Sequence, residues 1–92
     1  MAETVDELTV SYSEDGREVV KELDKEVLTK GAWATLMFKY QDMDKATGEY
    51  GPTKVTIRRY KKMGGSYRPQ SKFNISGEKQ AKQIADVLNR WF

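Results

Sequence analysis

The chain has 92 residues, of which 38% are hydrophobic and 33% charged, and its formal net charge is +2. This length predicts one globular domain with a small core that a partner subunit would help to stabilise. Neither cysteine nor histidine occurs, which excludes disulfides, thiolate metal sites and histidine-based catalysis. No apolar run approaches the ~20 residues of a membrane span, and the first residues lack the pattern of a secretory signal. We therefore expect a soluble, intracellular protein, either cytoplasmic or associated with the nucleoid.

The small net charge conceals an asymmetry along the chain. Residues 1–30 contain nine acidic and four basic residues, whereas residues 31–92 contain twelve basic and five acidic ones. The stretch from Thr53 to Phe73 contains seven basic residues and no acidic one. A solvated face usually mixes both signs because like charges repel. This stretch therefore predicts a polyanionic partner.

The N-terminal third is the least distinctive part of the pattern. We interpret residues 1–16 as an acidic arm, although alternating apolar residues within it leave a short strand open before a turn at 13–16. Residues 17–28 fit the spacing of a helix and that of a strand. Their abundant Glu and Lys residues favour a helix on propensity alone.

The remainder of the chain shows clearer elements. Alternating segments rich in β-branched and aromatic residues predict strands at 33–41, 53–62 and 67–75. A loop at 42–52 and a turn at 63–66 separate them, and Pro69 implies an edge strand or a bulge. Ser76 is predicted to cap a C-terminal helix with an apolar stripe of Ala81, Ile84, Ala85, Leu88, Trp91 and Phe92. This order predicts an antiparallel α+β domain over residues 17–92.

We predict that the helix covers one face of the sheet and leaves the other open. Strand alternation assigns cations and aromatic rings to the open face, as in single-strand binders, where each stacked base contributes about 1–3 kcal/mol. Packing in the core is an alternative role for Trp33 and Tyr60. Duplex readout is the weaker interpretation because the predicted helix carries mixed charges. The predicted nucleic-acid contacts are Arg17, Lys21, Trp33, Thr35, Met37, Lys39, Lys54, Thr56, Arg58, Tyr60, Lys62, Tyr67, Arg68 and Lys72.

The sequence shows no pattern typical of an enzyme. Asp42 and Asp44 lie in a loop rich in turn residues, where solvated carboxylates are common. Gly64-Gly65 lacks the lysine and the strand-to-helix context of a phosphate-binding loop. No hydroxyl side chain has a histidine to activate it. We therefore expect no catalysis, metal, cofactor or small-molecule substrate.

Two segments resemble a known family. Lys54-Val55-Thr56-Ile57-Arg58-Arg59-Tyr60 is similar to a basic strand ending in Ile-Arg-x-Tyr, and Phe73-Asn74-Ile75-Ser76-Gly77-Glu78 is similar to a strand-to-helix junction. From Trp33 onward, over about 60 residues, the chain resembles the transcriptional positive cofactor four family of whirly-type single-stranded DNA-binding proteins.

The resemblance implies four antiparallel strands, a C-terminal helix and single strands bound on the sheet. It makes Arg17 to Leu23 the first strand, against the propensity of that segment. It also implies a homodimer formed largely through the helix, for which we predict interface residues Ile84, Val87, Leu88, Trp91 and Phe92. Lys39 and Lys61 stand where many members have aromatic residues, and Gln80 stands where a tryptophan is common. We therefore expect weaker stacking and stronger electrostatics than in the family. The loop at 42–52 is also longer than usual, so the family's exact DNA path does not carry over.

The sequence thus predicts a homodimer that binds single-stranded DNA with little sequence preference and supports transcription, replication, recombination or repair. One alternative is an RNA-binding protein that uses the same face, because stacking and phosphate contacts do not exclude ribose. Another is a protein-interaction adaptor whose basic sheet docks an acidic partner.

Overall fold

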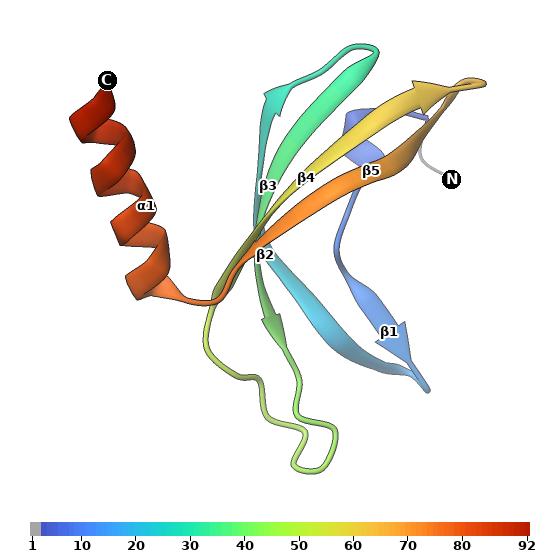
Figure 1. Ribbon diagram of the computed structural model, residues 1–92. Coiled ribbons are helices and arrows are strands. Elements are labelled where there is room, and N and C mark those ends of the chain that lie inside the picture. Colours follow the sequence, from blue (N-terminus) through green and yellow to red (C-terminus); the bar gives the residue numbers. More distant parts are fainter. Residues whose placement is uncertain (1–2) are drawn as a thin grey trace.

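A computed structural model describes residues 3–92, which form a five-stranded, curled antiparallel sheet followed by one helix (Figure 1). The strands pair in chain order, and a 3₁₀ turn, η1 (Val5–Glu7), precedes them. The α+β class is confirmed, but the prediction of four strands is wrong because residues 12–14 pair with the next strand as a fifth. Residues 1 and 2 of the predicted arm lie outside the described residues. The elements are β1 (Tyr12–Glu14), β2 (Arg17–Thr29), β3 (Trp33–Asp42), β4 (Lys54–Met63), β5 (Ser66–Ile75) and α1 (Glu78–Trp91).

The segment that fitted both helix and strand is β2, a strand of 13 residues. Its Glu and Lys residues favour a helix, but β2 pairs with β1 at one end and with β3 along most of its length. Strand formation depends on such cross-strand packing more than on intrinsic propensity. The tertiary pairing therefore decides the conformation of this segment, as the family resemblance implied.

The hairpin between β4 and β5 has the predicted turn and the predicted irregularity. Gly64 and Gly65 both adopt positive φ, at 60° and 84°, as a tight two-residue hairpin turn requires. β5 is an edge strand, and its register with β4 shifts where the partners change from Ser71 to Pro69. Pro69 thus occupies both an edge and a bulge, where its missing N–H is tolerated.

The core lies on one side of the sheet, which we call the inner face. The β3 residues Ala34, Leu36 and Phe38 point to this side and are fully buried. Leu8 and Val10, from the segment that we had assigned to the acidic arm, belong to the same buried cluster. The N-terminal segment therefore covers the inner face.

Two charged side chains of β2 hold this segment in place. The Lys25 ammonium donates hydrogen bonds to the carbonyl oxygens of Val5 at 2.6 Å and Leu8 at 2.7 Å. The Glu22 carboxylate accepts a 2.6 Å hydrogen bond from the Thr9 hydroxyl. The N-terminal segment is thus tied to β2 by hydrogen bonds as well as by its buried apolar side chains.

The helix does not cover the sheet, which corrects our expectation. Among residues 3–92, no residue of α1 is buried, and Figure 1 shows the helix beside the sheet, on the side away from β1. Gly77, rather than Ser76, occupies the N-cap position, and no side chain caps the helix there. The Ser76 hydroxyl instead donates to the Gln80 side-chain oxygen at 3.3 Å.

Candidate nucleic-acid interface

The side of the sheet opposite the core, which we call the outer face, carries the four predicted β3 contacts Trp33, Thr35, Met37 and Lys39. Their partners on β4 are Lys61, Arg59, Ile57 and Val55, in that order. Residues directly opposite each other in an antiparallel pair point to the same face. The β4 residues on the outer face are therefore the odd-numbered ones.

This register overturns the expectation of one shared face. The predicted β4 contacts Lys54, Thr56 and Arg58 pair with Tyr40, Phe38 and Leu36, so they belong to the inner face with the core. Strand alternation shows which residues of one strand share a side, but not which side faces the core. We had assigned the wrong side of β4 to the solvent.

Three of the predicted contacts are buried. Thr56 is fully buried, and its hydroxyl donates to the Asn74 side-chain oxygen at 2.7 Å. Tyr60 is only 4% exposed, in agreement with its alternative role as a packing residue, and burial raises the pKa of its phenol. Tyr67 is also buried, and its hydroxyl donates to the Gly31 carbonyl at 2.6 Å. None of these three side chains presents a free face to a ligand in this structure.

Three more predicted contacts lie at the loop end of the sheet. Arg17 donates to the Met43 sulfur at 3.8 Å, and the Lys21 ammonium lies 5.3 Å from the centre of the Tyr50 ring. Lys54 forms an ion pair with Asp42 at 2.9 Å, and this hydrogen bond raises the pKa of Lys54. These cations are thus engaged by the end of β3 and by the loop that follows it.

The outer face has a basic and aromatic cluster near the β4–β5 hairpin. Trp33 is 42% exposed, the Arg59 guanidinium carbon lies 4.7 Å from the centre of its ring, and the Lys61 ammonium lies 5.3 Å away. Arg68 lies directly opposite Lys61 on β5, and Thr35 lies opposite Arg59. We call this cluster the hairpin patch, which consists of Trp33, Thr35, Arg59, Lys61 and Arg68.

Sequence reasoning missed Arg59 and Lys61 because it placed the even-numbered β4 residues outward. The sizes of the opposing β3 residues could have shown which β4 residues face outward. Ala34 leaves room for a large ring on the adjacent strand, and Tyr60 fills that room. Burying Tyr60 turns its neighbours Arg59 and Lys61 to the outside.

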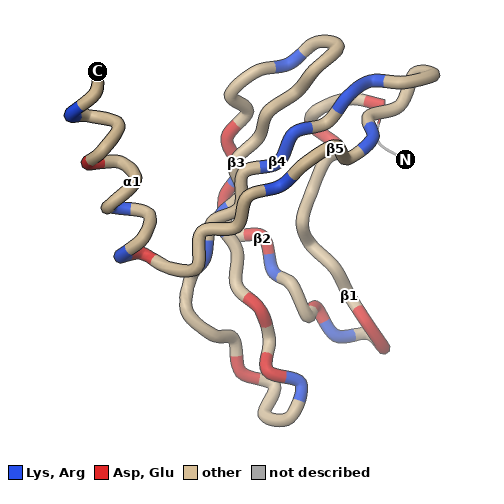
Figure 2. The backbone as a smooth tube through the Cα atoms, in the orientation of Figure 1, with Lys and Arg blue, Asp and Glu red and all other residues tan. Residues whose placement is uncertain are grey.

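The basic stretch is largely free of acidic partners. Of the seven basic residues between Thr53 and Phe73, only Lys54 forms an ion pair within the described range 3–92. The other six divide equally between the two faces of the β4–β5 hairpin: Arg59, Lys61 and Arg68 outward, and Arg58, Lys62 and Lys72 inward. Figure 2 shows basic positions running along β4 and β5 toward their hairpin, with acidic positions around the β1–β2 turn and the loop after β3.

The outer face changes character away from the hairpin patch. Met37, Ile57 and Phe73 form one cross-strand row, and Val55 and Ile75 lie in the next. The Phe73 side chain is 54% exposed. Except for Lys39, which lies opposite Val55, the β3–β5 part of this half of the outer face is therefore apolar.

A separate apolar surface lies on the helix. Ile84, Val87, Leu88 and Trp91 line a shallow groove along α1, with the i, i+3, i+4, i+7 spacing of an amphipathic helix. Trp91 is 73% exposed, and Phe92 is 98% exposed. The predicted dimer residues therefore share one surface, together with the chain end that follows it.

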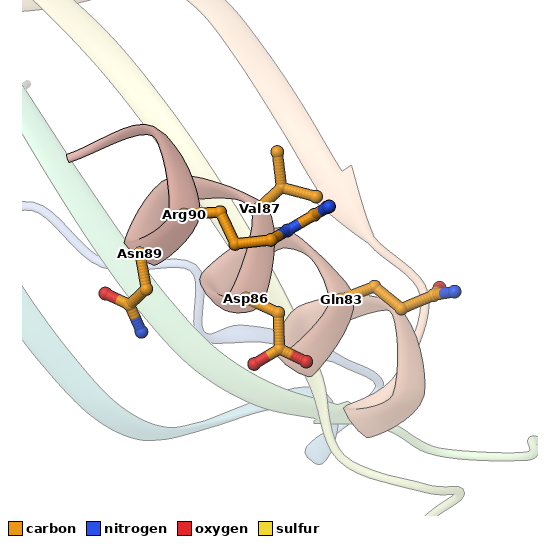
Figure 3. Close-up of a pocket in the computed structure, with 5 residues that line it drawn as sticks. All are labelled: Gln83, Asp86, Val87, Asn89 and Arg90. Atoms are coloured by element: carbon orange, nitrogen blue, oxygen red, sulfur yellow. The ribbon is translucent and has the colours of Figure 1, made fainter.

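A hollow of about 600 Å³ lies on another side of this helix. It is lined by Gln83, Asp86, Val87, Asn89 and Arg90, and Figure 3 shows the polar side chains of this group pointing in different directions. Ligand sites need polar groups that converge. This hollow therefore gives no indication of a small-molecule site.

Residues 3–92 contain no group of three or more acidic side chains arranged to hold a metal ion. No helix within these residues has the length and apolar character needed to cross a membrane.

Comparison with protein-family models, curated proteins and solved structures finds no significant match to this chain.

Proposed function

We propose that this protein binds single-stranded DNA with little sequence preference through the hairpin patch. The observation that carries the proposal is Trp33, a partly exposed indole flanked by Arg59 and Lys61 on an otherwise open sheet face. Neither cation forms an ion pair with a carboxylate in the described residues. Single-strand binders combine such cations, which contact phosphates, with rings on which bases stack.

The geometry favours a single strand over a duplex. A duplex hides the faces of its bases, so an exposed indole gains stacking energy only with unpaired bases. Reading the major groove would require an inserted helix or ribbon. The only helix among residues 3–92 has mixed charges, and its Lys82 is paired with Glu78 at 2.8 Å. The similarity to the positive cofactor four family supports the same choice.

Titration with homopolymeric DNA, RNA and duplex at one fixed salt concentration tests this proposal. We expect oligothymidylate to bind more tightly than duplex of equal length, with an affinity that decreases as salt increases. Equal affinity for RNA would extend the function to both nucleic acids. If single strands fail to bind while an acidic polypeptide such as polyglutamate binds, the basic patch is a protein-docking surface and the proposal is wrong.

We further propose that the protein acts as a homodimer through α1 and the apolar half of the outer face. A 14-residue helix with no buried residue is only marginally stable alone in water. The accessible surface is 6566 Å², whereas a compact monomer of this mass exposes about 5,500 Å². The excess is close to the surface of about 800 Å² that each partner buries in a standard interface.

A second copy of the chain accounts for both uncovered surfaces. The apolar stripe of α1 and the row of Met37, Ile57 and Phe73 are complementary in character, and a two-fold dimer would present both of them twice. The hairpin patch lies at the other end of the outer face, so it would stay available to nucleic acid.

Sedimentation equilibrium at micromolar concentration tests the dimer. We expect the parent protein to sediment as a dimer, and Leu88→Asp to shift it to a monomer because a charge would enter the apolar interface. Asn89→Asp places the same charge on the neighbouring, polar position of α1 and should leave the dimer intact. A monomeric parent protein would contradict the proposal.

A further inference from the structure

A like-charge pair lies on the inner face of the β4–β5 hairpin, away from the hairpin patch. Arg58 and Lys72 are directly opposite each other in the register of the two strands. Like charges in this position destabilise a sheet. Neither side chain forms an ion pair with a carboxylate anywhere in residues 3–92. A bound anion between the two cations would remove this repulsion.

Arg58 also has an unused hydrogen-bond donor. Its Nε atom is buried and, among the described residues, has no acceptor. Buried donors in proteins are nearly always paired, so this N–H indicates an acceptor that the chain itself does not supply. The inner-face carboxylate of Glu22 is engaged elsewhere, because it accepts hydrogen bonds from the Thr9 hydroxyl and, at 3.4 Å, from the Val10 backbone N–H.

A cavity of about 290 Å³ is present at the same place. Its lining contains both cations and no carboxylate, and consists of Arg58, Pro69, Gln70, Ser71 and Lys72. It lies where the bulge shifts the register between β4 and β5, and β5 is the edge of the sheet. A ligand can therefore approach from the open side of β5. We call this cavity the Arg58–Lys72 cleft.

We propose that the Arg58–Lys72 cleft binds one phosphate group. The planar edge of a guanidinium matches two phosphate oxygens, and Lys72 adds a second positive charge from the neighbouring strand. Gln70, the extra residue of the bulge, lines the same cleft, although its amide lies 4.0 Å from the Met63 sulfur. The phosphate belongs either to the backbone of a nucleic acid that passes over the β5 edge or to a free phosphate monoester. The cleft and the hairpin patch are on opposite faces, so this proposal does not depend on the proposed function.

Direct NMR observation of arginine Nε–H resonances tests the cleft, with Arg58→Lys used to assign the Arg58 signal. We expect a saturable shift of this signal on addition of inorganic phosphate, with sodium chloride of equal ionic strength as the control. Dimethyl phosphate distinguishes the two sources, because its saturable binding indicates a nucleic-acid diester and its failure beside inorganic phosphate indicates a monoester. An equal shift in sodium chloride, or parallel shifts of all arginines, would overturn the proposal.

Variants then test the residues. Arg58→Lys keeps the charge but removes the planar edge, so phosphate affinity should decrease about tenfold or more. Lys72→Gln, at an exposed position, should weaken phosphate binding severalfold without unfolding the protein. Circular dichroism verifies that both variants are folded. Lys79→Gln, at an exposed position of α1 outside the cleft and the hairpin patch, is the control and should leave phosphate affinity unchanged. Unchanged affinity in the Lys72 variant, or an equal loss in the Lys79 variant, excludes the cleft.

Discussion

Ala34 and Tyr60 lie directly opposite each other on β3 and β4, and both point into the core. The small side chain of Ala34 leaves the space that the phenol ring occupies. Because side chains alternate along a strand, this pair turns Arg59 and Lys61 to the outer face and Arg58 to the inner face. One core contact thereby determines how the basic residues of β4 are distributed between the two faces.

The burial of Tyr60 predicts a loss of stability in alkaline solution. Burial raises the pKa of Tyr60 above its ordinary value of 10.0, although Arg58 acts in the opposite direction. The folded state thus holds the phenol proton more tightly than the unfolded state does. The contribution of this buried phenol to the free energy of unfolding is therefore complete below about pH 10, and it is lost as the pH rises toward the folded-state pKa. The free energy of unfolding, measured by urea denaturation, should decrease between about pH 9 and pH 11 in the parent protein. This decrease should be smaller in the Tyr60→Phe variant. Tyr12→Phe, at an exposed position, is the control, and equal decreases in both variants would contradict the burial of Tyr60.

The position of Leu8 in the core predicts that shortening this one side chain has a large effect on the free energy of unfolding. Leu8 is 7% exposed beneath the sheet, so Leu8→Ala should lower the free energy of unfolding by about 2–4 kcal/mol. The same substitution at Leu28, which is 54% exposed, should cost far less. Urea denaturation of the two variants makes the comparison. Similar losses at both positions would show that residues 5–10 are a dispensable arm.

The exposed indole predicts a discrimination between single strands and duplex. Trp33→Leu keeps an apolar side chain but removes the stacking surface, so binding to oligothymidylate should weaken by about 1–3 kcal/mol with little change on duplex. Tyr12→Leu removes another exposed aromatic ring, outside the patch, and serves as the control. Fluorescence anisotropy of labelled oligonucleotides measures both substrates. Equal losses on single strand and duplex would make the patch a purely electrostatic surface.

Much of the secondary structure could be predicted from local sequence. The β4–β5 turn follows from Gly64-Gly65, the irregularity of β5 follows from Pro69, and the helix follows from its apolar spacing. Each of these features is encoded within a few neighbouring residues. The strand conformation of β2 is different, because it depends on pairing with residues far along the chain.

The arrangement of the site could not be predicted in the same way. β4 carries large side chains on both faces, with Ile57 outward and Tyr60 inward, so alternation alone does not identify its core side. The register with β3 pairs residues across the loop of residues 43–53 and places Tyr60 opposite Ala34. The cover of the inner face by Leu8 is likewise a contact between distant segments. Both features required the three-dimensional structure.

Two adjacent lysines test the central claim, that nucleic acid binds the outer hairpin patch, most directly. Lys61 points to the outer face and Lys62 to the inner face, so Lys61→Gln and Lys62→Gln remove the same charge from opposite sides of one strand. The measurement is the affinity for oligothymidylate as a function of salt concentration. We expect Lys61→Gln to weaken binding and to reduce the slope of log K against log salt by about 0.7, the contribution of one phosphate contact on a single strand, while Lys62→Gln keeps the parental slope. Equal changes in both variants, or a change in Lys62→Gln alone, would contradict the assignment of the outer face as the binding surface.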